Sequence, residues 1–126
     1  LVRSRGLGDV YKAGVAYQAG ELKHGTISLI EKDTPVIAIS TDDSLREKTI
    51  SNIKEVKARG AYVVYVTNET PQEKFYDDII TIKKIHPILE SILTIIPLQL
   101  LSYKVAKDNG CDIDKPRNLA KSVTVE

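Results

Sequence analysis

The sequence predicts an α/β domain with a mostly parallel sheet. Short runs rich in Val, Ile, Thr and Tyr alternate with longer segments of helical periodicity. The first of these runs is apolar on both faces, which is typical of a parallel strand covered by helices on both sides. A chain of 126 residues that is 42% hydrophobic and 28% charged has the size and composition of one soluble domain with a buried core.

Three segments are predicted to be strands: residues 35–40, 61–67 and 79–84. The first reads P-V-I-A-I-S, and because both of its faces are apolar we expect it in the interior of the sheet. The second reads A-Y-V-V-Y-V-T, in which Tyr62 and Tyr65 are three residues apart and therefore point to opposite faces. Right-handed crossovers would place the connecting helices on the faces of this sheet.

Helical periodicity covers residues 45–59 and 86–107. Gly60 is a natural stop for the first helix, and Gly110 follows the end of the second. His86 is expected to cap the start of the second helix rather than to act in chemistry. The apolar stripe of the first helix consists of Leu45, Ile50, Ile53 and Val56.

The segment before the first strand is expected to contain short helices. Residues 10–20 combine good helix formers with small residues at three-residue spacing, which predicts a helix packed closely on another element. Residues 21–30 are expected to form a turn or a second short helix. Gly20 and Gly25 bracket the sequence E-L-K-H, so the backbone is expected to turn sharply there.

Polar residues 41–44 follow the first strand and are expected to provide a helix N-cap. In open parallel sheets, ligands bind beyond the carboxyl ends of the strands, which points to the loops after Ser40 and Thr67. A phosphate site requires backbone N–H groups without neighbouring carboxylates. Asp42 and Asp43 therefore argue against a phosphate at the first of these loops.

Charge and composition exclude several classes of partner. The chain has 18 basic and 17 acidic residues, well mixed along the sequence, with a net charge of +1. It therefore lacks the excess of basic residues that would favour binding to nucleic acid or to an acidic membrane. Charged residues and a proline interrupt the apolar run at residues 85–105, so we do not expect a membrane span.

With one cysteine, Cys111, no internal disulfide can form, and no cluster of His and Cys could hold zinc. We expect a cytoplasmic protein that needs no metal or organic cofactor. Because the sequence lacks Met, we also expect a fragment or a processed piece.

The tail at residues 111–126 contains more conformationally restricted and reactive residues than is typical of a frayed chain end. It contains the fixed backbone of Pro116, the capping-type Asn118, a lone Lys121 and then the β-branched run V-T-V. We expect a tail of this kind to dock on the domain, and a lysine on a docked tail is a candidate for amine or Schiff-base chemistry. From the residues alone, a solvated tail lysine is the favoured interpretation.

Two motifs carry a resemblance to a known family. The ending D-x-D-x-P-R-N-L-A-K-S-V-T-V-E and the sequence A-G-E-L-K-H-G at residues 19–25 resemble the isomerising glutamine:fructose-6-phosphate aminotransferases, also called glucosamine-6-phosphate synthases. Less specific agreement comes from P-L-Q-L-L-S-Y at residues 97–103 and N-I-K-E-V-K-A-R-G at residues 52–60. The resemblance spans roughly residues 17–126.

The resemblance implies a flavodoxin-like, three-layer sugar-isomerase domain. Residues 1–110 would form the second of two such subdomains, incomplete at its N-terminus, and residues 111–126 would be a docked tail that lines the active site. The implied reaction converts D-fructose 6-phosphate and L-glutamine to D-glucosamine 6-phosphate and L-glutamate. The implied partners are the sugar phosphate, the glutaminase domain of the parent chain and a second copy in a homodimer.

The same resemblance implies roles for five residues. His24 would promote opening of the sugar ring, presented to the active site of the neighbouring subunit. Lys121 would engage the carbonyl of the open-chain sugar, while Asn118, Leu119 and Ala120 would contact the substrate. From the residues alone, a surface or capping histidine beside a turn is the favoured interpretation of His24.

Three family features are missing from this sequence. It has no glutaminase half, no first sugar-isomerase subdomain with its Ser/Thr-rich phosphate loop, and no E-G-A-L-K-L-K-E-I helix carrying the glutamate that moves the proton between C1 and C2. Asp9 is the only acid in the corresponding stretch, and we do not transfer the base role to it. We therefore expect the isolated chain to be inactive. The alternative is a non-catalytic sugar-phosphate-binding or dimerisation module.

Overall fold

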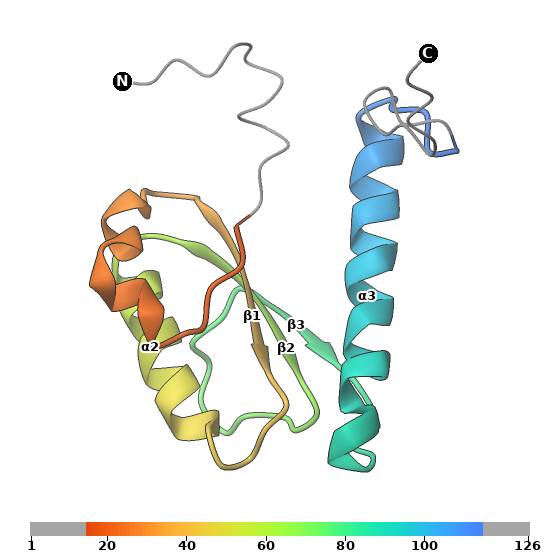
Figure 1. The fold of residues 1–126 in the computed structure, drawn as a ribbon. Helices are drawn as coiled ribbons and strands as arrows, with labels where there is room; N and C mark the ends of the chain where they lie inside the picture. Colours follow the sequence, from red (N-terminus) through yellow and green to blue (C-terminus); the bar gives the residue numbers. More distant parts are fainter. Residues whose placement is uncertain (1–14, 115–126) are drawn as a thin grey trace, which may run out of the picture.

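The computed structural model describes residues 15–114, which form a three-stranded parallel sheet with helices on both sides (Figure 1). The strand order is β1-β2-β3, and both strand pairs are parallel, as predicted. In chain order the elements are η1 (Glu21–His24), η2 (Thr26–Leu29), β1 (Pro35–Ser40), α2 (Arg46–Ala58), β2 (Tyr62–Thr67), β3 (Asp78–Thr81) and α3 (Pro87–Asp108), where η denotes a 3₁₀ helix.

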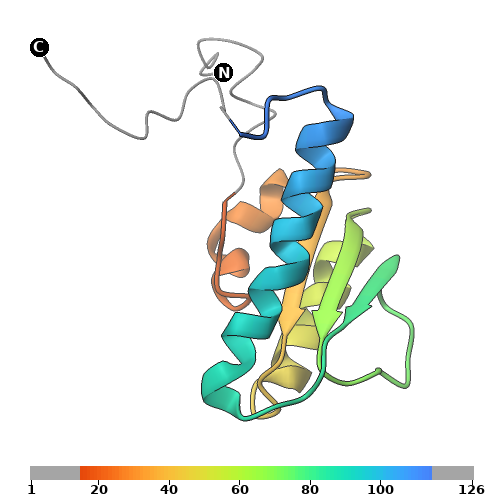
Figure 2. The ribbon, with the colours of Figure 1, turned by 90° about the vertical axis from the view of Figure 1, so that its right-hand side faces the viewer.

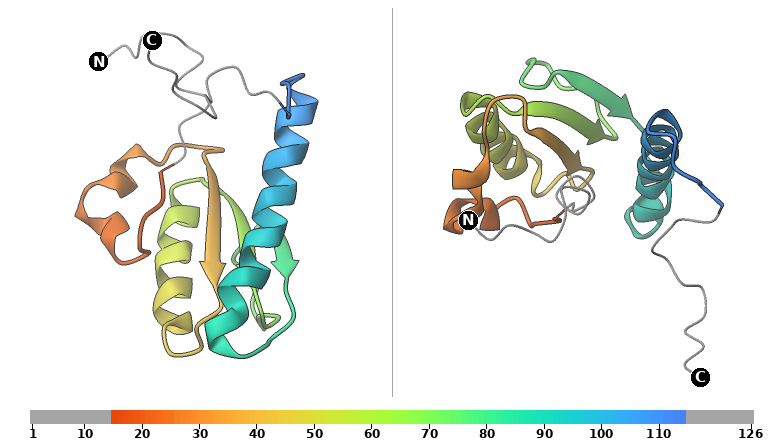
Figure 3. Two further views of the ribbon diagram at one scale, coloured as in Figure 1. Left: turned by 45° about the vertical axis from the view of Figure 1, so that its right-hand side comes forward. Right: turned by 90° about the horizontal axis from the view of Figure 1, so that it is seen from above.

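The structure has the predicted three layers. Helix α2 and the two 3₁₀ helices cover one face of the sheet, and α3 lies along the other side (Figure 3). The core lies between α2 and the sheet, because Ile53 and Val56 of α2 pack against Val63 and Tyr65 of β2. The ring of Phe75, from the loop before β3, meets Tyr65 edge-on with 5.1 Å between centroids.

Strand β1 differs from its predicted position. The sequence favoured an interior strand, but β1 is an edge strand of the described sheet. Ile37 and Ile39, on its face towards α3, are 45% and 43% exposed. The strand has the composition of a buried one, yet among residues 15–114 no element packs closely on this face.

The ends of the helices are largely as predicted. Gly60 and Gly110 follow α2 and α3 with φ of 91° and 67°, values that favour glycine. His86 is the N-cap of α3, and its Nδ1 accepts a hydrogen bond of 3.4 Å from the backbone N–H of Ile88. The predicted side-chain cap of α2 is wrong, because Asp42 instead accepts bonds from the backbone N–H and hydroxyl of Ser44.

The predicted helix over residues 10–20 is absent from its described part. Residues 15–18 have no regular structure, and a turn at Ala19 and Gly20 leads into η1. Val15 and Tyr17 are exposed, so this stretch has little packing that could hold a helix. Residues 10–14 lie outside the described part of the chain.

Helix α3 touches the rest of the fold mainly at its start. Seen from its own side, it runs along β1 and partly in front of it, and β2 and β3 lie further to one side (Figure 2). Much of its apolar surface is exposed, for example Ile88, Ile92 and Leu100. By length and composition alone α3 could cross a membrane, with 11% of the relevant window buried. However, its buried residues Glu90 and Thr94 face the sheet, so the helix is an element of the fold with an uncovered outer side.

Candidate functional site

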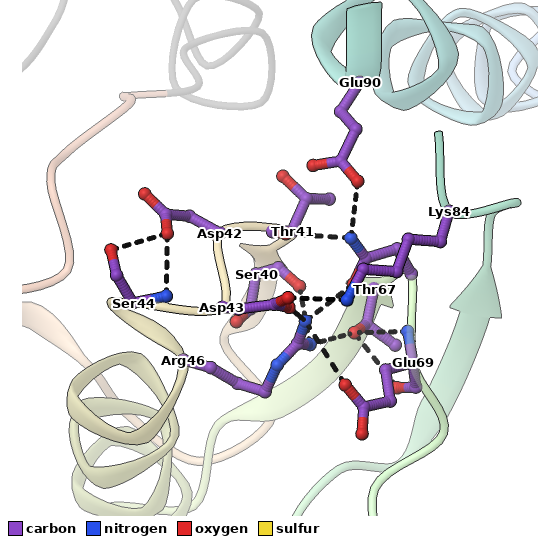
Figure 4. A network of polar contacts seen from close by, with 11 residues as sticks. Ser40, Thr41, Asp42, Asp43, Ser44, Arg46, Thr67, Glu69, Lys84 and Glu90 are labelled. Atoms are coloured by element: carbon purple, nitrogen blue, oxygen red, sulfur yellow. Dashed lines mark hydrogen bonds and ion pairs between the residues drawn. The ribbon is translucent and has the colours of Figure 1, made fainter. Parts of the chain in front are cut away.

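The carboxyl ends of β1 and β2 meet the first turns of α2 and α3, and a polar network fills this corner (Figure 4). Arg46, the first residue of α2, lies at its centre. Its guanidinium donates to the backbone carbonyl of Ser40 at 3.3 Å, to the hydroxyl of Thr67 at 3.0 Å and to the amide oxygen of Asn68 at 2.7 Å. Ser40 and Thr67 are partners in the sheet register, so Arg46 joins the ends of both strands.

Asp43 links this arginine to Lys84, in the connection between β3 and α3. Its carboxylate accepts from the ammonium of Lys84 at 2.5 Å and, through the other oxygen, from Arg46. These hydrogen bonds, the one from Lys84 first, lower the pKa of Asp43 below its usual value. The same contact with Asp43 raises the pKa of Lys84. Asp43 is therefore held as a carboxylate between two cations.

Asn68 and Glu90 extend the network to α3. The Asn68 amide donates to the backbone carbonyl of Thr41 at 2.8 Å and to Glu90 Oε1 at 2.7 Å. Glu90 is only 6% exposed, so this hydrogen bond gives its buried carboxylate a partner. The same bond connects the first turns of α3 to the end of β2.

A cavity of about 750 Å³ opens beside this network, between the end of β1 and α3. Its polar wall includes Asp42, Asp43, Lys84 and Glu90, and its apolar wall comes from Ile39 and from α3. The cavity occupies the place where the sequence predicted a ligand, beyond the carboxyl ends of the strands. Three carboxylates on one wall make it a poor phosphate site, in line with the argument from Asp42 and Asp43. Across residues 15–114, no group of three or more His, Cys, Asp or Glu side chains is placed to hold a metal ion.

His24 lies elsewhere, at the end of η1. Its ring is largely exposed, and its Nδ1 is 2.9 Å from Oε2 of Glu21. Gly25 follows with φ of 140°, which turns the chain sharply into η2 as the sequence predicted. Lys23 forms an ion pair of 2.6 Å with Glu55, near the C-terminal end of α2. This contact places η1 beside α2, away from the corner at which Arg46 begins that helix.

The structure thus places one of the five predicted site residues. His24 is on the surface, on the α2 side of the sheet, and is not brought to the cavity at the carboxyl ends. The predicted substrate-contacting residues Asn118, Leu119 and Ala120, and the predicted catalytic Lys121, lie outside the described residues, as does most of the predicted tail.

Sequence reasoning missed the network itself. Arg46 and its acceptor Asn68 are 22 residues apart, and no local pattern links them. One signal was available: Glu90 is the one acid in the largely apolar first half of α3, and an acid in such a position is often buried with a partner. A second signal was the E-x-x-H spacing of Glu21 and His24, since residues three apart share a face in a 3₁₀ helix.

Comparison with known proteins agrees with this architecture. A solved structure described as the C-terminal domain of glucosamine-fructose-6-phosphate aminotransferase from Francisella tularensis superimposes with a TM-score of 0.71 at 36% identity, covering 78% of this chain and 28% of that one. The fold is therefore that of a domain in this aminotransferase.

Curated relatives are closer in sequence. The protein named glutamine–fructose-6-phosphate aminotransferase [isomerizing] from Caldanaerobacter subterraneus is 56% identical over 113 residues, and the protein of the same name from Thermus thermophilus is 50% identical. In both cases the match covers 88% of this chain and 19% of the relative, so the chain spans about a fifth of their length. The sequence model of the SIS domain matches residues 11–106, and the chain accordingly belongs to the SIS domain family.

Proposed function

We propose that the chain is the C-terminal sugar-isomerase part of a cytoplasmic, isomerising glutamine–fructose-6-phosphate aminotransferase. The full-length protein would convert D-fructose 6-phosphate and L-glutamine to D-glucosamine 6-phosphate and L-glutamate. The observation that carries this proposal is the 56% identity, over 88% of the chain, to a relative named for that reaction. The TM-score of 0.71 to the C-terminal domain of such an enzyme supports it.

In this proposal His24 opens the sugar ring. Ring opening of a hemiketal needs a group that takes the proton of the anomeric hydroxyl and returns one to the ring oxygen, and a histidine is suited to this near neutral pH. The exposed position of His24 supports a role at the surface of a second subunit, since a ring that points outward is available to a neighbour. The active protein would therefore be a homodimer.

Lys121 would act on the opened sugar. An uncharged lysine amine can add to a ketone carbonyl and form an imine with loss of water. The tail at residues 111–126 would line the active site, with Asn118, Leu119 and Ala120 against the substrate. No metal or organic cofactor is needed for this step, because the carbonyl or imine itself acidifies the neighbouring C–H.

The phosphate would be held by another part of the full-length chain. The cavity at the carboxyl ends of β1 and β2 has Asp42, Asp43 and Glu90 on its wall, which disfavours a dianionic group. The glutaminase half and the base that moves the proton from C1 to C2 would also come from outside this chain.

The test is Lys121→Ala in the full-length protein, with Lys107→Ala, an exposed lysine at the end of α3, as the matched control. Formation of glucosamine 6-phosphate should fall by about 10²- to 10⁴-fold in the first variant, the range for loss of a positioned catalytic group. Thermal unfolding and glutamine hydrolysis should be unchanged, and the control should keep full activity.

A second candidate is a non-catalytic sugar-phosphate-binding or dimerisation module. The uncovered apolar side of α3 favours this reading for the chain on its own, since such surfaces mark interfaces. If Lys121→Ala left product formation within about two-fold of wild type, the module would be the better description and the catalytic proposal would be wrong.

A further inference from the structure

His24 does not stand alone on the surface of η1. Its Nδ1 lies 2.9 Å from Oε2 of Glu21, and no other ion pair or hydrogen bond of the described residues involves either side chain. An ionised carboxylate can only accept a hydrogen bond, so Nδ1 must carry the proton in this contact. The neutral imidazole then has its free lone pair on Nε2, the ring nitrogen directed away from Glu21.

The geometry of η1 makes this pairing. In a 3₁₀ helix, residues three apart lie one above the other, so Glu21 and His24 share one side. The two residues between them hold the helix in place: Leu22 packs against the core, and Lys23 pairs with Glu55 of α2 at 2.6 Å. The helix is thus anchored through its middle residues, and the side chains at its two ends point outward together.

We propose that Glu21 is the positioning residue for His24: by accepting a hydrogen bond from Nδ1–H it fixes the tautomer and the orientation of the ring, so that Nε2 is presented as the proton-accepting atom. The proposal rests on the function proposed for His24 above. No comparison assigns a role to Glu21. The relation resembles that of a triad carboxylate to its histidine, in which the carboxylate orients the ring without itself taking the proton.

The pair contributes little to folding, which makes the inference testable. The Glu21 and His24 side chains are 59% and 72% exposed, and contacts between groups this open to water are worth little to stability. Substitutions at either position should therefore leave the fold and its thermal unfolding unchanged. A loss of activity can then be assigned to the chemistry.

The experiment uses the full-length protein and measures formation of glucosamine 6-phosphate by Glu21→Ala, Glu21→Gln, His24→Ala and the double variant of Glu21→Ala with His24→Ala. Glu47→Gln, an exposed acid in the first turn of α2, is the matched control. Glu21→Ala should lower kcat by about ten-fold or more, a part of the roughly 10²- to 10⁴-fold that a positioned acid–base group provides, with KM for the sugar phosphate nearly unchanged. Glu21→Gln should retain most of kcat, because the amide oxygen of glutamine can still accept a hydrogen bond from Nδ1–H.

The double variant separates positioning from a purely structural effect. If Glu21 acts through His24, adding Glu21→Ala to His24→Ala should cause no further loss of kcat. Three results would overturn the positioning role: an equal further loss in the double variant, a Glu21→Gln enzyme as slow as Glu21→Ala, or full activity of Glu21→Ala while His24→Ala is slow. Full activity of His24→Ala would instead refute the function proposed for His24 itself.

Discussion

Arg46→Ala is expected to destabilise the chain by about 2–4 kcal/mol, although arginines on helices usually contribute little. The side chain is 15% exposed and donates to four acceptors, which lie at the carboxyl ends of β1 and β2 and on Asp43. Removing it leaves the carbonyl of Ser40 and the amide oxygen of Asn68 without these donors. Each buried acceptor left unpaired costs about 1–2 kcal/mol, which gives the expected sum.

Two of the partners limit the loss. The hydroxyl of Thr67 keeps its bond from the backbone N–H of Glu69 at 3.2 Å. Asp43 keeps Lys84 at 2.5 Å, so its charge is not left alone. These surviving contacts are the reason that the expected cost stays below that of breaking a fully buried ion pair.

The assay is urea unfolding at neutral pH followed by far-UV circular dichroism, with the slope m checked for each variant. Arg59→Ala is the matched control, because Arg59 is an exposed arginine at the end of α2 whose side chain, among residues 15–114, bonds the carbonyl of Glu55 alone, at 3.2 Å. The control should change the unfolding free energy by less than about 0.5 kcal/mol. A change below about 1 kcal/mol for Arg46→Ala, or one equal to that of the control, would refute the central place given to this arginine.

Two further predictions concern pH and backbone geometry. The hydrogen bond from Lys57, followed by that from the Val63 N–H, lowers the pKa of Asp77 below its ordinary value of 3.8. The stability that ionised Asp77 contributes is therefore present above pH 3.8 and is lost as the pH falls through the lower pKa of the folded state. Asp77→Asn should therefore flatten the fall in the urea midpoint between about pH 5 and pH 2, and an unchanged pH profile would contradict this. Gly60→Ala should destabilise by about 1–3 kcal/mol, because φ is 91° and the new Cβ would lie 3.2 Å from the backbone of Lys32. In thermal unfolding the control Gly20→Ala, with open space around it, should be nearly neutral, and equal effects of the two changes would show that the reasoning is wrong.

Local patterns were enough to predict most elements of the fold. The β-branched runs that became β1 and β2 lie within one residue of their predicted bounds, because strand composition and flanking turns are local properties. Gly60 marked the end of α2 for the same reason. Family resemblance supplied the three-layer arrangement, which the positions of α2 and α3 on opposite sides of the sheet confirmed (Figure 3).

The errors arose where the outcome depends on distant residues. Whether β1 is interior or at an edge depends on which segments lie beside it, and its own sequence cannot decide this. Asp42 was a good candidate for capping α2, but its carboxylate accepts a hydrogen bond from the backbone N–H of Ser44 instead. The network around Arg46 joins residues more than twenty positions apart, so it could be found only in the folded structure.

The edge position of β1 also bears on how the chain behaves in concentrated solution. Within the described residues, the outer side of this strand carries backbone N–H and C=O groups with no neighbouring strand. The six residues P-V-I-A-I-S include no charged side chain, and only the proline at the start interrupts the row of donors. Natural proteins protect such edges with lysines, bulges or a covering segment, because an unprotected edge is a template for another strand. A net charge of +1 gives little repulsion between copies, so this edge, more than the overall charge, would govern the colloidal stability of the chain.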